Sequence, residues 1–426
     1  MRTESVPSVA RLARSRPQRP LALPLIAAAL LLLAADTAVA QVAVRGDLVY
    51  TMAGPPLVNG MVLVEDGKIV ALGGADQIQV PEGVPLLTAA VVTPGLIDAH
   101  SVVGLSGILN FDQDQDQLER SSAMQPELRA IDAYNAREEL IEWVRGFGVT
   151  TLHTGHAPGE LISGQTCIVK TRGNTVDEAL LVPARAVACT LGPRAEKSGD
   201  RSPGTRGKMM SMLRAEFLRA REYQARRAAA DEEDDKDPPA RDLRLETLVD
   251  VLEGKLPLLV TADRAQDIAS ALRLADEFGL KLWLDSAAEA YLLTDEIRRA
   301  GVPVIVHPTM SRTFGDRENL SYATAGRLVA AGIPVALQSG YEAYVPKTRI
   351  VLFEAALAAA HGLSREEALA TITSRAAEIL GIADRVGTLA VGKDGDLALY
   401  DGDPLEYTTH CIGVVIEGQV VSRTPQ

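Results

Sequence analysis

The side chains best suited to metal or proton chemistry in this sequence are its six histidines. Neutral imidazoles bind zinc, and they exchange protons near neutral pH. His153 and His156 follow one apolar run and precede a glycine-rich segment, and His307 ends another apolar run. Both positions are typical of the carboxyl end of a strand, where active-site residues lie in barrel enzymes. The six histidines are His100, His153, His156, His307, His361 and His410.

Four of these histidines could act together on one metal ion, through His100, His153, His156 and His307. A catalytic zinc needs three such ligands and an open position for water. Their spacing is no metal signature, so hydrogen-bonded polar residues at the rim of a pocket are the competing interpretation. The other residues that we predict to line this pocket are Asp263, Asp285 and Gln338.

The elements that must position these residues change in character along the chain. Residues 41–93 and 384–426 carry short β-branched runs separated by turn signals, among them a predicted strand at Gly387–Val391. We therefore predict a composite β-domain built from both chain ends. Between them, residues 94–383 alternate apolar strands with amphipathic helices, which predicts a parallel sheet.

Several helices are predicted inside this middle region. One has Ile268, Leu272, Ala275 and Phe278 on a single face, and another covers Gly207–Ala230 within an insertion at residues 195–245. The acidic run 231–237 in that insertion is predicted to be a solvated loop. Two helices, about Thr348–His361 and Ser364–Leu380, close the series.

Three segments at the two ends of this region resemble one enzyme family. The string Thr93-Pro-Gly-Leu-Ile-Asp-Ala-His100 resembles the entry to the first barrel strand of the amidohydrolase superfamily, near its imidazolonepropionase-like and dipeptidase-like members. Residues 373–381 and 387–398 resemble the closing helix and the return into the β-domain. The resemblance implies an α/β fold, a (β/α)₈ TIM-like barrel with a small β-domain, and hydrolysis of C–N or related bonds by a metal-bound hydroxide.

The family's metal ligands do not carry over. His100 matches the first histidine of the family's His-x-His pair, but Val102 stands at the second position. Thr261 and Ser286 stand where strands five and six should each supply a histidine, and Gly340 replaces the aspartate of strand eight. For the bridging Lys or Glu, Lys170 is the nearest candidate. We therefore expect no cofactor, although a single divalent metal such as zinc would suit a remodelled site.

The N-terminus predicts export. Arginines precede the apolar stretch Leu21–Ala35, and small residues at 38–40 offer a cleavage site, which is typical of a signal peptide over residues 1–40. The mature protein would then be periplasmic or secreted, with no stable membrane span. The formal net charge of −13 argues against nucleic acid as a partner.

Three functions remain open from the sequence. The first is an exported amidohydrolase-superfamily protein whose dinuclear metal site is lost, so that it is inactive or altered and binds a small-molecule or peptide-like ligand. The second is an active hydrolase with a remodelled single-metal site. The third is a structural periplasmic protein that binds no ligand. Whether the protein is an enzyme, and its oligomeric state, are not decided by the sequence.

Overall fold

The computed structural model describes residues 41–109, 111–197, 202–232, 237–341 and 350–426. The predicted signal peptide lies outside these ranges, as do residues 233–236 of the acidic run. Within the described ranges, none of the helices has the length and apolar character that crossing a bilayer requires.

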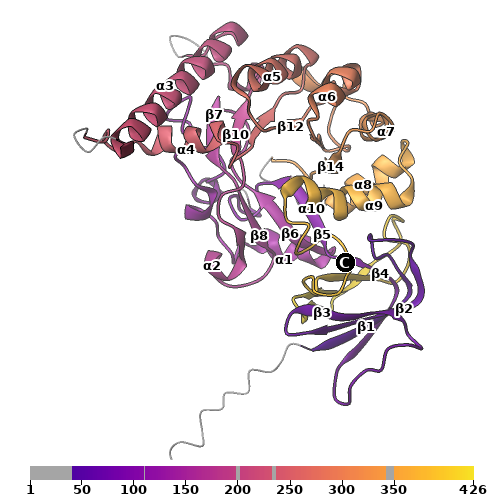
Figure 1. Cartoon of the computed structure of the whole chain (residues 1–426). Coiled ribbons are helices and arrows are strands. Elements are labelled where there is room, and N and C mark those ends of the chain that lie inside the picture. The colour runs from indigo at the N-terminus through magenta and orange to yellow at the C-terminus, as the bar shows by residue number, and fades with distance from the viewer. Residues whose placement is uncertain (1–40, 110, 198–201, 233–236, 342–349) are drawn as a thin grey trace, which may run out of the picture. The chain divides into compact units, whose positions relative to one another are not determined.

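A seven-stranded sheet takes strands from both ends of the chain, in the order β17-β16-β15-β4-β1-β2-β3 (Figure 1). Neighbouring strands are antiparallel except for β1 and β4, which are parallel. One face of this sheet buries an apolar cluster that includes Val44, Val62 and Leu399. The strands are β1 (Val42–Val49), β2 (Leu57–Glu65), β3 (Lys68–Gly74), β4 (Leu86–Pro94), β15 (Leu397–Tyr400), β16 (Cys411–Ile416) and β17 (Gln419–Ser422).

Two further sheets form the middle of the chain. In the six-stranded sheet, of order β14-β13-β12-β11-β10-β7, the strands from β10 to β14 are parallel and β7 is antiparallel. In the four-stranded sheet, of order β5-β6-β8-β9, only β5 and β6 are parallel. The strands are β5 (Leu96–Ser101), β6 (Val149–Thr154), β7 (Ile162–Gln165), β8 (Cys167–Lys170), β9 (Leu180–Val182), β10 (Val187–Thr190), β11 (Leu258–Thr261), β12 (Leu282–Ser286), β13 (Val304–Val306) and β14 (Val335–Leu337).

The α/β class that we predicted is confirmed, although β7, β8 and β9 are antiparallel where we expected parallel units only. The connections that follow β11, β12 and β13 each contain a helix, as a parallel crossover requires. Figure 1 shows α3 and α5 to α7 along the outer side of the six-stranded sheet. The α-helices are α1 (Glu139–Gly146), α2 (Val176–Ala179), α3 (Arg206–Glu232), α4 (Leu243–Leu252), α5 (Ala265–Phe278), α6 (Thr294–Ala300), α7 (Thr324–Ala330), α8 (Val351–Ala360), α9 (Arg365–Thr371) and α10 (Ser374–Leu380).

The predicted amphipathic helices form with small shifts. Helix α3 buries Met209, Leu213 and Phe217, because these residues share one face at helical spacing. On α5 the fully buried face includes Ile268 and Leu274, whereas Leu272 is only partly buried. Helix α5 ends at Gly279, whose φ of 70° is left-handed, a conformation that glycine adopts without steric cost.

Two predicted elements are wrong. Ser364–Leu380 is not one helix but two, α9 and α10, because the backbone leaves helical geometry at Thr373, with φ −139° and ψ −97°. The hydroxyls of Thr371 and Thr373 donate to main-chain carbonyls, as Ser and Thr do where helices end or bend. Residues 387–391 form no strand, and Leu389 N–H instead donates to the carbonyl of Thr51, two residues after β1.

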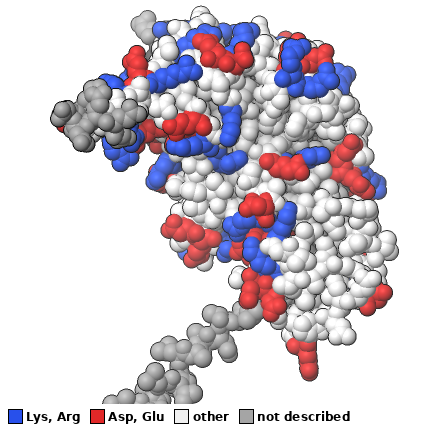
Figure 2. Space-filling model, viewed as in Figure 1, with Lys and Arg blue, Asp and Glu red and all other residues white. Residues whose placement is uncertain are grey.

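Charged side chains of both signs are mixed on the face that Figure 2 shows. Ion pairs between exposed side chains occur in the described chain, for example between Arg214 Nε and Glu277 Oε2 at 2.7 Å. On this face of the described chain, therefore, no broad basic surface develops.

Candidate functional site

Four side chains meet at the carboxyl ends of the parallel strands, and we call this group the strand-end hub: Asp285, His100, Thr261 and Gln338. Asp285 lies at the end of β12, directly opposite Thr261 in the β11–β12 register. Its Oδ1 is 2.8 Å from His100 Nδ1 and accepts a hydrogen bond from Gln338 Nε2, also at 2.8 Å. Its Oδ2 accepts from the Thr261 hydroxyl at 2.6 Å. All four side chains are buried.

The hub fixes the protonation of its histidine. Burial alone would lower the pKa of His100, but the carboxylate of Asp285 outweighs burial and raises it. Burial likewise disfavours the charged form of Asp285, yet His100, Thr261 and Gln338 lower its pKa overall. The hydrogen atom between them therefore lies on His100 Nδ1. The backbone of His156 also raises the pKa of His100. The Nε2 atom is buried and makes no hydrogen bond of normal geometry with the described residues.

A second buried carboxylate lies on β5, two residues before His100. Asp98 accepts from the backbone N–H of Ser339 at 3.0 Å and from the Ser339 hydroxyl. Burial nevertheless raises the pKa of Asp98 to about 6. Ser339 is a site residue that we did not predict from the sequence, although it directly follows Gln338.

The other predicted histidines lie in separate surroundings. His153 is on β6, with its ring 5.7 Å from that of His100, but both of its nitrogens are engaged, with Ala99 O at 2.6 Å and Thr166 Oγ1 at 2.7 Å. His156 packs against Gly164, and neither of its nitrogens has a partner among the described residues. Burial lowers the pKa of His153 to about 3 and that of His156 to about 4.

His307 follows β13 and lies near Asp263. Its Nδ1 is 2.9 Å from the Pro308 carbonyl, which can only accept, so Nδ1 carries the hydrogen and Nε2 is an open acceptor. Burial lowers the pKa of His307 to about 4, partly offset by the charge of Asp263. Asp263 itself accepts from the Ser286 hydroxyl at 2.6 Å.

The predicted residues do not form a metal-ligand set. No group of three or more His, Cys, Asp or Glu side chains in the described ranges could hold a metal ion. His153 has no free nitrogen, and the Nδ1 of His100 is committed to Asp285. The donor set for a remodelled zinc site therefore does not fit, and we derive no step through a metal.

A tyrosine that we did not predict lies near both His100 of the hub and Arg194. The Tyr341 ring is 5.9 Å from that of His100, and the Arg194 guanidinium lies 5.2 Å from the Tyr341 ring centroid. Arg194 also lines a cavity of about 430 Å³ together with Glu160 and Lys197. Because Tyr341 follows Gly340 directly, its place near the strand ends could have been read from the sequence.

Another cavity, of about 590 Å³, lies between the loop after β1 and helices α9 and α10. Its lining includes Tyr50, Glu366 and Arg375. Among the residues that line it, none has a buried side-chain atom that lacks a partner. This cavity therefore lacks the unpaired polar groups of the strand-end region.

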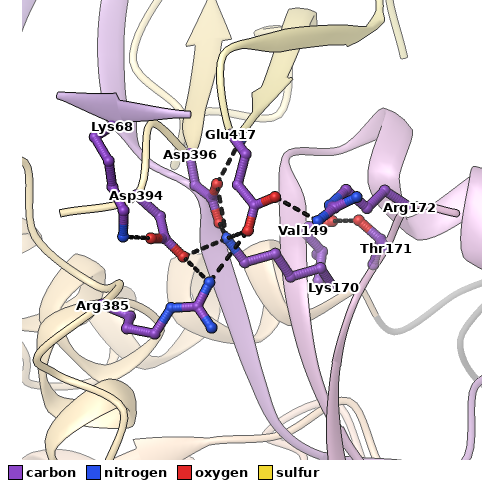
Figure 3. Close-up of polar contacts among 9 residues, drawn as sticks. All are labelled: Lys68, Val149, Lys170, Thr171, Arg172, Arg385, Asp394, Asp396 and Glu417. Atoms are coloured by element: carbon purple, nitrogen blue, oxygen red, sulfur yellow. Dashed lines mark hydrogen bonds and ion pairs between the residues drawn. The ribbon is translucent and has the colours of Figure 1, made fainter. Parts of the chain in front are cut away.

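Lys170, our nearest candidate for the family's bridging ligand, is wrong for that role. In the antiparallel β6–β8 register it pairs with Thr151, at the start of β6, and so lies at the opposite end from His100. Its ammonium contacts Asp394 at 2.6 Å, Asp396 at 3.0 Å and Glu417 at 2.9 Å (Figure 3). These carboxylates belong to the segments around β15 and β16, so Lys170 ties β8 to the seven-stranded sheet.

Comparison with known proteins agrees with the architecture. The model of the amidohydrolase family (Amidohydro_3) matches residues 286–422. The crystal structure of an amidohydrolase from Thermotoga maritima MSB8 is 27% identical and has a TM-score of 0.85, covering 90% of this chain and 100% of that one. An adenosine deaminase from Xanthomonas campestris with bound zinc is 16% identical, with a TM-score of 0.53 over 89% of this chain and 92% of that one, a likeness of fold alone.

Sequence relatives agree with this result. The amidohydrolase tasK of Hapsidospora irregularis is 25% identical over 84% of this chain, but the match spans only 39% of that relative's length. An imidazolonepropionase from Fusobacterium nucleatum is 26% identical over 84% of this chain and 88% of its own. From the matched segments and the common fold, the chain belongs to the amidohydrolase superfamily.

Proposed function

We propose that this protein binds a small polar ligand, a small molecule or an amide or peptide-like compound, at the strand-end hub, and that the hydrolysis of C–N bonds by its relatives is lost or altered in it. One observation carries the proposal. At the strand ends, His100 Nε2, His307 Nε2, Gln338 Oε1 and the Tyr341 hydroxyl are all buried and make no hydrogen bond of normal geometry with the described residues.

Such groups are costly to leave unpaired, because a buried donor or acceptor without a partner loses about 1–3 kcal/mol. A ligand with both donors and acceptors would satisfy them. His100, held by Asp285, would donate from Nε2, while the neutral His307 and the carbonyl of Gln338 would accept.

The test combines metal analysis with binding. Protein purified without chelators or a histidine tag would be analysed for zinc, manganese and iron, and titrated calorimetrically with N-acetyl-alanine, a dipeptide and a cyclic amide. We expect metal well below one ion per chain, saturable binding of at least one probe without turnover, and loss of that binding in His100→Gln. The control is His410→Gln, because His410 is exposed and paired only with Asp401.

The alternative, a hydrolase with one metal ion, makes the opposite prediction. About one zinc per chain, with hydrolysis of a probe that a chelator abolishes, would replace our proposal by this one. The zinc that accompanies the Xanthomonas campestris deaminase keeps this alternative worth testing. No binding of any probe, in protein with native stability, would count against both.

We also propose the domain arrangement and the location that the sequence suggests. The parallel bridge between Ser101 and Gly340 supports a barrel in which β5 and β14 are neighbours, and the seven-stranded sheet supports a composite β-domain. The arginines and apolar run of residues 1–40 support export. Sequencing the N-terminus of protein from the periplasm should begin near Gln41, whereas an intact Met1 would refute cleavage.

A further inference from the structure

We infer that the carboxylate of Asp285 does in this protein what a metal ion does in its relatives: it joins the ends of the barrel strands and fixes the direction of the site side chains. Asp285 is thus a positioning residue. The inference goes beyond the proposed ligand binding, because it holds whether or not a ligand binds.

The contacts of Asp285 reach three other strands. His100 ends β5, Thr261 ends β11 and Gln338 follows β14, while Asp285 itself is on β12. The contacts measure 2.8 Å, 2.6 Å and 2.8 Å in that order. With one carboxylate, therefore, the ends of four strands are linked.

The linked positions overlap those that hold metal in the family pattern. His100 stands at the first ligand position, and Thr261 stands at the ligand position of strand five. Gln338 lies two residues before Gly340, the position of the family's strand-eight aspartate. The same part of the fold is thus cross-linked, but through different atoms.

The polarity of this centre is opposite to that of a metal site. A metal ion is surrounded by atoms that offer lone pairs, such as imidazole nitrogen and carboxylate oxygen. Around Asp285 the neighbours instead present hydrogens, from the His100 ring, the Thr261 hydroxyl and the Gln338 amide. The amide is held in that orientation, since its Nε2 also donates to Ile305 O at 3.3 Å. Such a shell stabilises an anion and repels a cation.

The hub also determines which polar atoms of His100 and Gln338 remain available to a ligand. Because His100 Nδ1 and Gln338 Nε2 are both bound to Asp285, the atoms left over are His100 Nε2 and Gln338 Oε1. Loss of the carboxylate would free both side chains to rotate. Asp285 therefore determines what the site can offer without touching the ligand itself.

The experiment is NMR and thermal unfolding of histidine-labelled protein. In the wild type, one imidazole Nδ1–H, assigned by its absence in His100→Gln, should be shifted downfield by its carboxylate partner. Thermal stability should not change with EDTA or with added zinc. Asp285→Asn should move that signal upfield and lower the melting temperature by about 5 °C.

The matched control is Asp267→Asn. Asp267 is also buried, and it accepts from Arg206 at 2.7 Å and 3.1 Å on helix α5, away from the hub. This variant should lose stability without moving the His100 signal. If Asp285→Asn does not fold, the wild-type spectrum and Gln338→Leu, which removes one donor only, still decide the question.

Two results would overturn the inference. One is a His100 signal that is the same in wild type and Asp285→Asn. The other is zinc that raises the melting temperature of the wild type and abolishes the Nδ1–H signal, because His100 would then bind the ion and not the carboxylate. Neither result depends on whether any ligand binds, so the proposed function can fail separately.

Discussion

Two groups of polar side chains lie at opposite ends of the central strands, and they differ in how their charges and hydrogen bonds are compensated. The first is the strand-end hub. The second, which we call the Lys170 cluster, joins β8 to the seven-stranded sheet. Figure 3 shows how closely its charges are grouped. Its members are Lys68, Lys170, Arg172, Arg385, Asp394, Asp396 and Glu417.

Every cation of the Lys170 cluster contacts a carboxylate, and Lys170 alone contacts three. Burial opposes the charge of Lys170, but the carboxylates outweigh it and raise its pKa. Both groups contain buried polar atoms without a hydrogen-bond partner among the described residues, including Arg172 Nε and Asp396 Oδ2 in the Lys170 cluster. In that cluster, however, both side chains form ion pairs with an opposite charge. Near the hub, the open atoms of Gln338 and Tyr341 belong to uncharged side chains, so no ion pair compensates them.

The largest expected effect is on acid stability, and it belongs to the strand-end side. Buried His153, His156 and His307 have folded-state pKa values of about 3, 4 and 4, below the ordinary 6.5, so the unfolded chain gains protons that the folded one refuses as the pH falls. Asp98 acts oppositely, because its raised pKa of about 6 lets the folded chain take up a proton first.

Near pH 5, the unfolded chain binds about two more protons at these four residues than the folded chain does. The free energy of unfolding should therefore fall by roughly 2–3 kcal/mol for each unit by which the pH is lowered between pH 6 and pH 4. Urea denaturation at several pH values measures this slope. His156→Gln removes one titrating group and should reduce the slope by about one proton. An unchanged slope in this variant would show that His156 titrates normally.

The next effect belongs to the Lys170 cluster. Lys170→Met should cost about 3–5 kcal/mol, because it leaves buried carboxylates without their cation. The matched change Lys68→Met should cost less than about 1 kcal/mol, since the Lys68 side chain is 47% exposed and its partner Asp394 keeps two other cations. Denaturation of both variants at pH 7 compares them, and equal losses would mean that Lys170 is not the centre of the cluster.

A smaller loss of stability is expected when a hydrogen-bonded hydroxyl is removed at Thr261, and none when an unpaired hydroxyl is removed at Thr150. Thr261→Val removes a donor to the buried, charged Asp285 and should cost about 1.5–3 kcal/mol. Thr150→Val should be neutral or stabilising, because the buried Thr150 hydroxyl has no partner among the described residues. Calorimetric unfolding of the two variants gives the comparison. A similar loss in both would remove the case for a special hydrogen bond at Thr261.

The sequence predicted the strand ends better than it predicted the contacts between them. Apolar runs placed β11 to β14 correctly, and Asp285, near the end of β12, does meet both His100 and Gln338. What a strand pattern cannot supply is the choice of partner, because strand order and register bring together residues that are 185 positions apart. Lys170 shows the limit of such a prediction. Its neighbouring residues resemble a strand that carries a metal ligand, but β8 runs antiparallel to β6, so Lys170 lies at the end of the strands opposite to His100.

The smallest change in stability should accompany a clear change in binding. Tyr341→Phe removes a buried hydroxyl that has no partner among the described residues, so stability should change by less than about 0.5 kcal/mol. If that hydroxyl contacts the ligand, binding of a probe should weaken by roughly tenfold, the worth of one hydrogen bond.

Tyr400→Phe is the matched control at the other end. The Tyr400 hydroxyl is also buried but donates to Phe147 O at 3.2 Å, so this variant should lose about 1 kcal/mol while binding the probe normally. Thermal unfolding and calorimetric titration of both variants would give opposite patterns. If Tyr341→Phe lost stability and kept its affinity, the open polar atoms near His100 would be structural, and the contrast between the strand-end hub and the Lys170 cluster would fail.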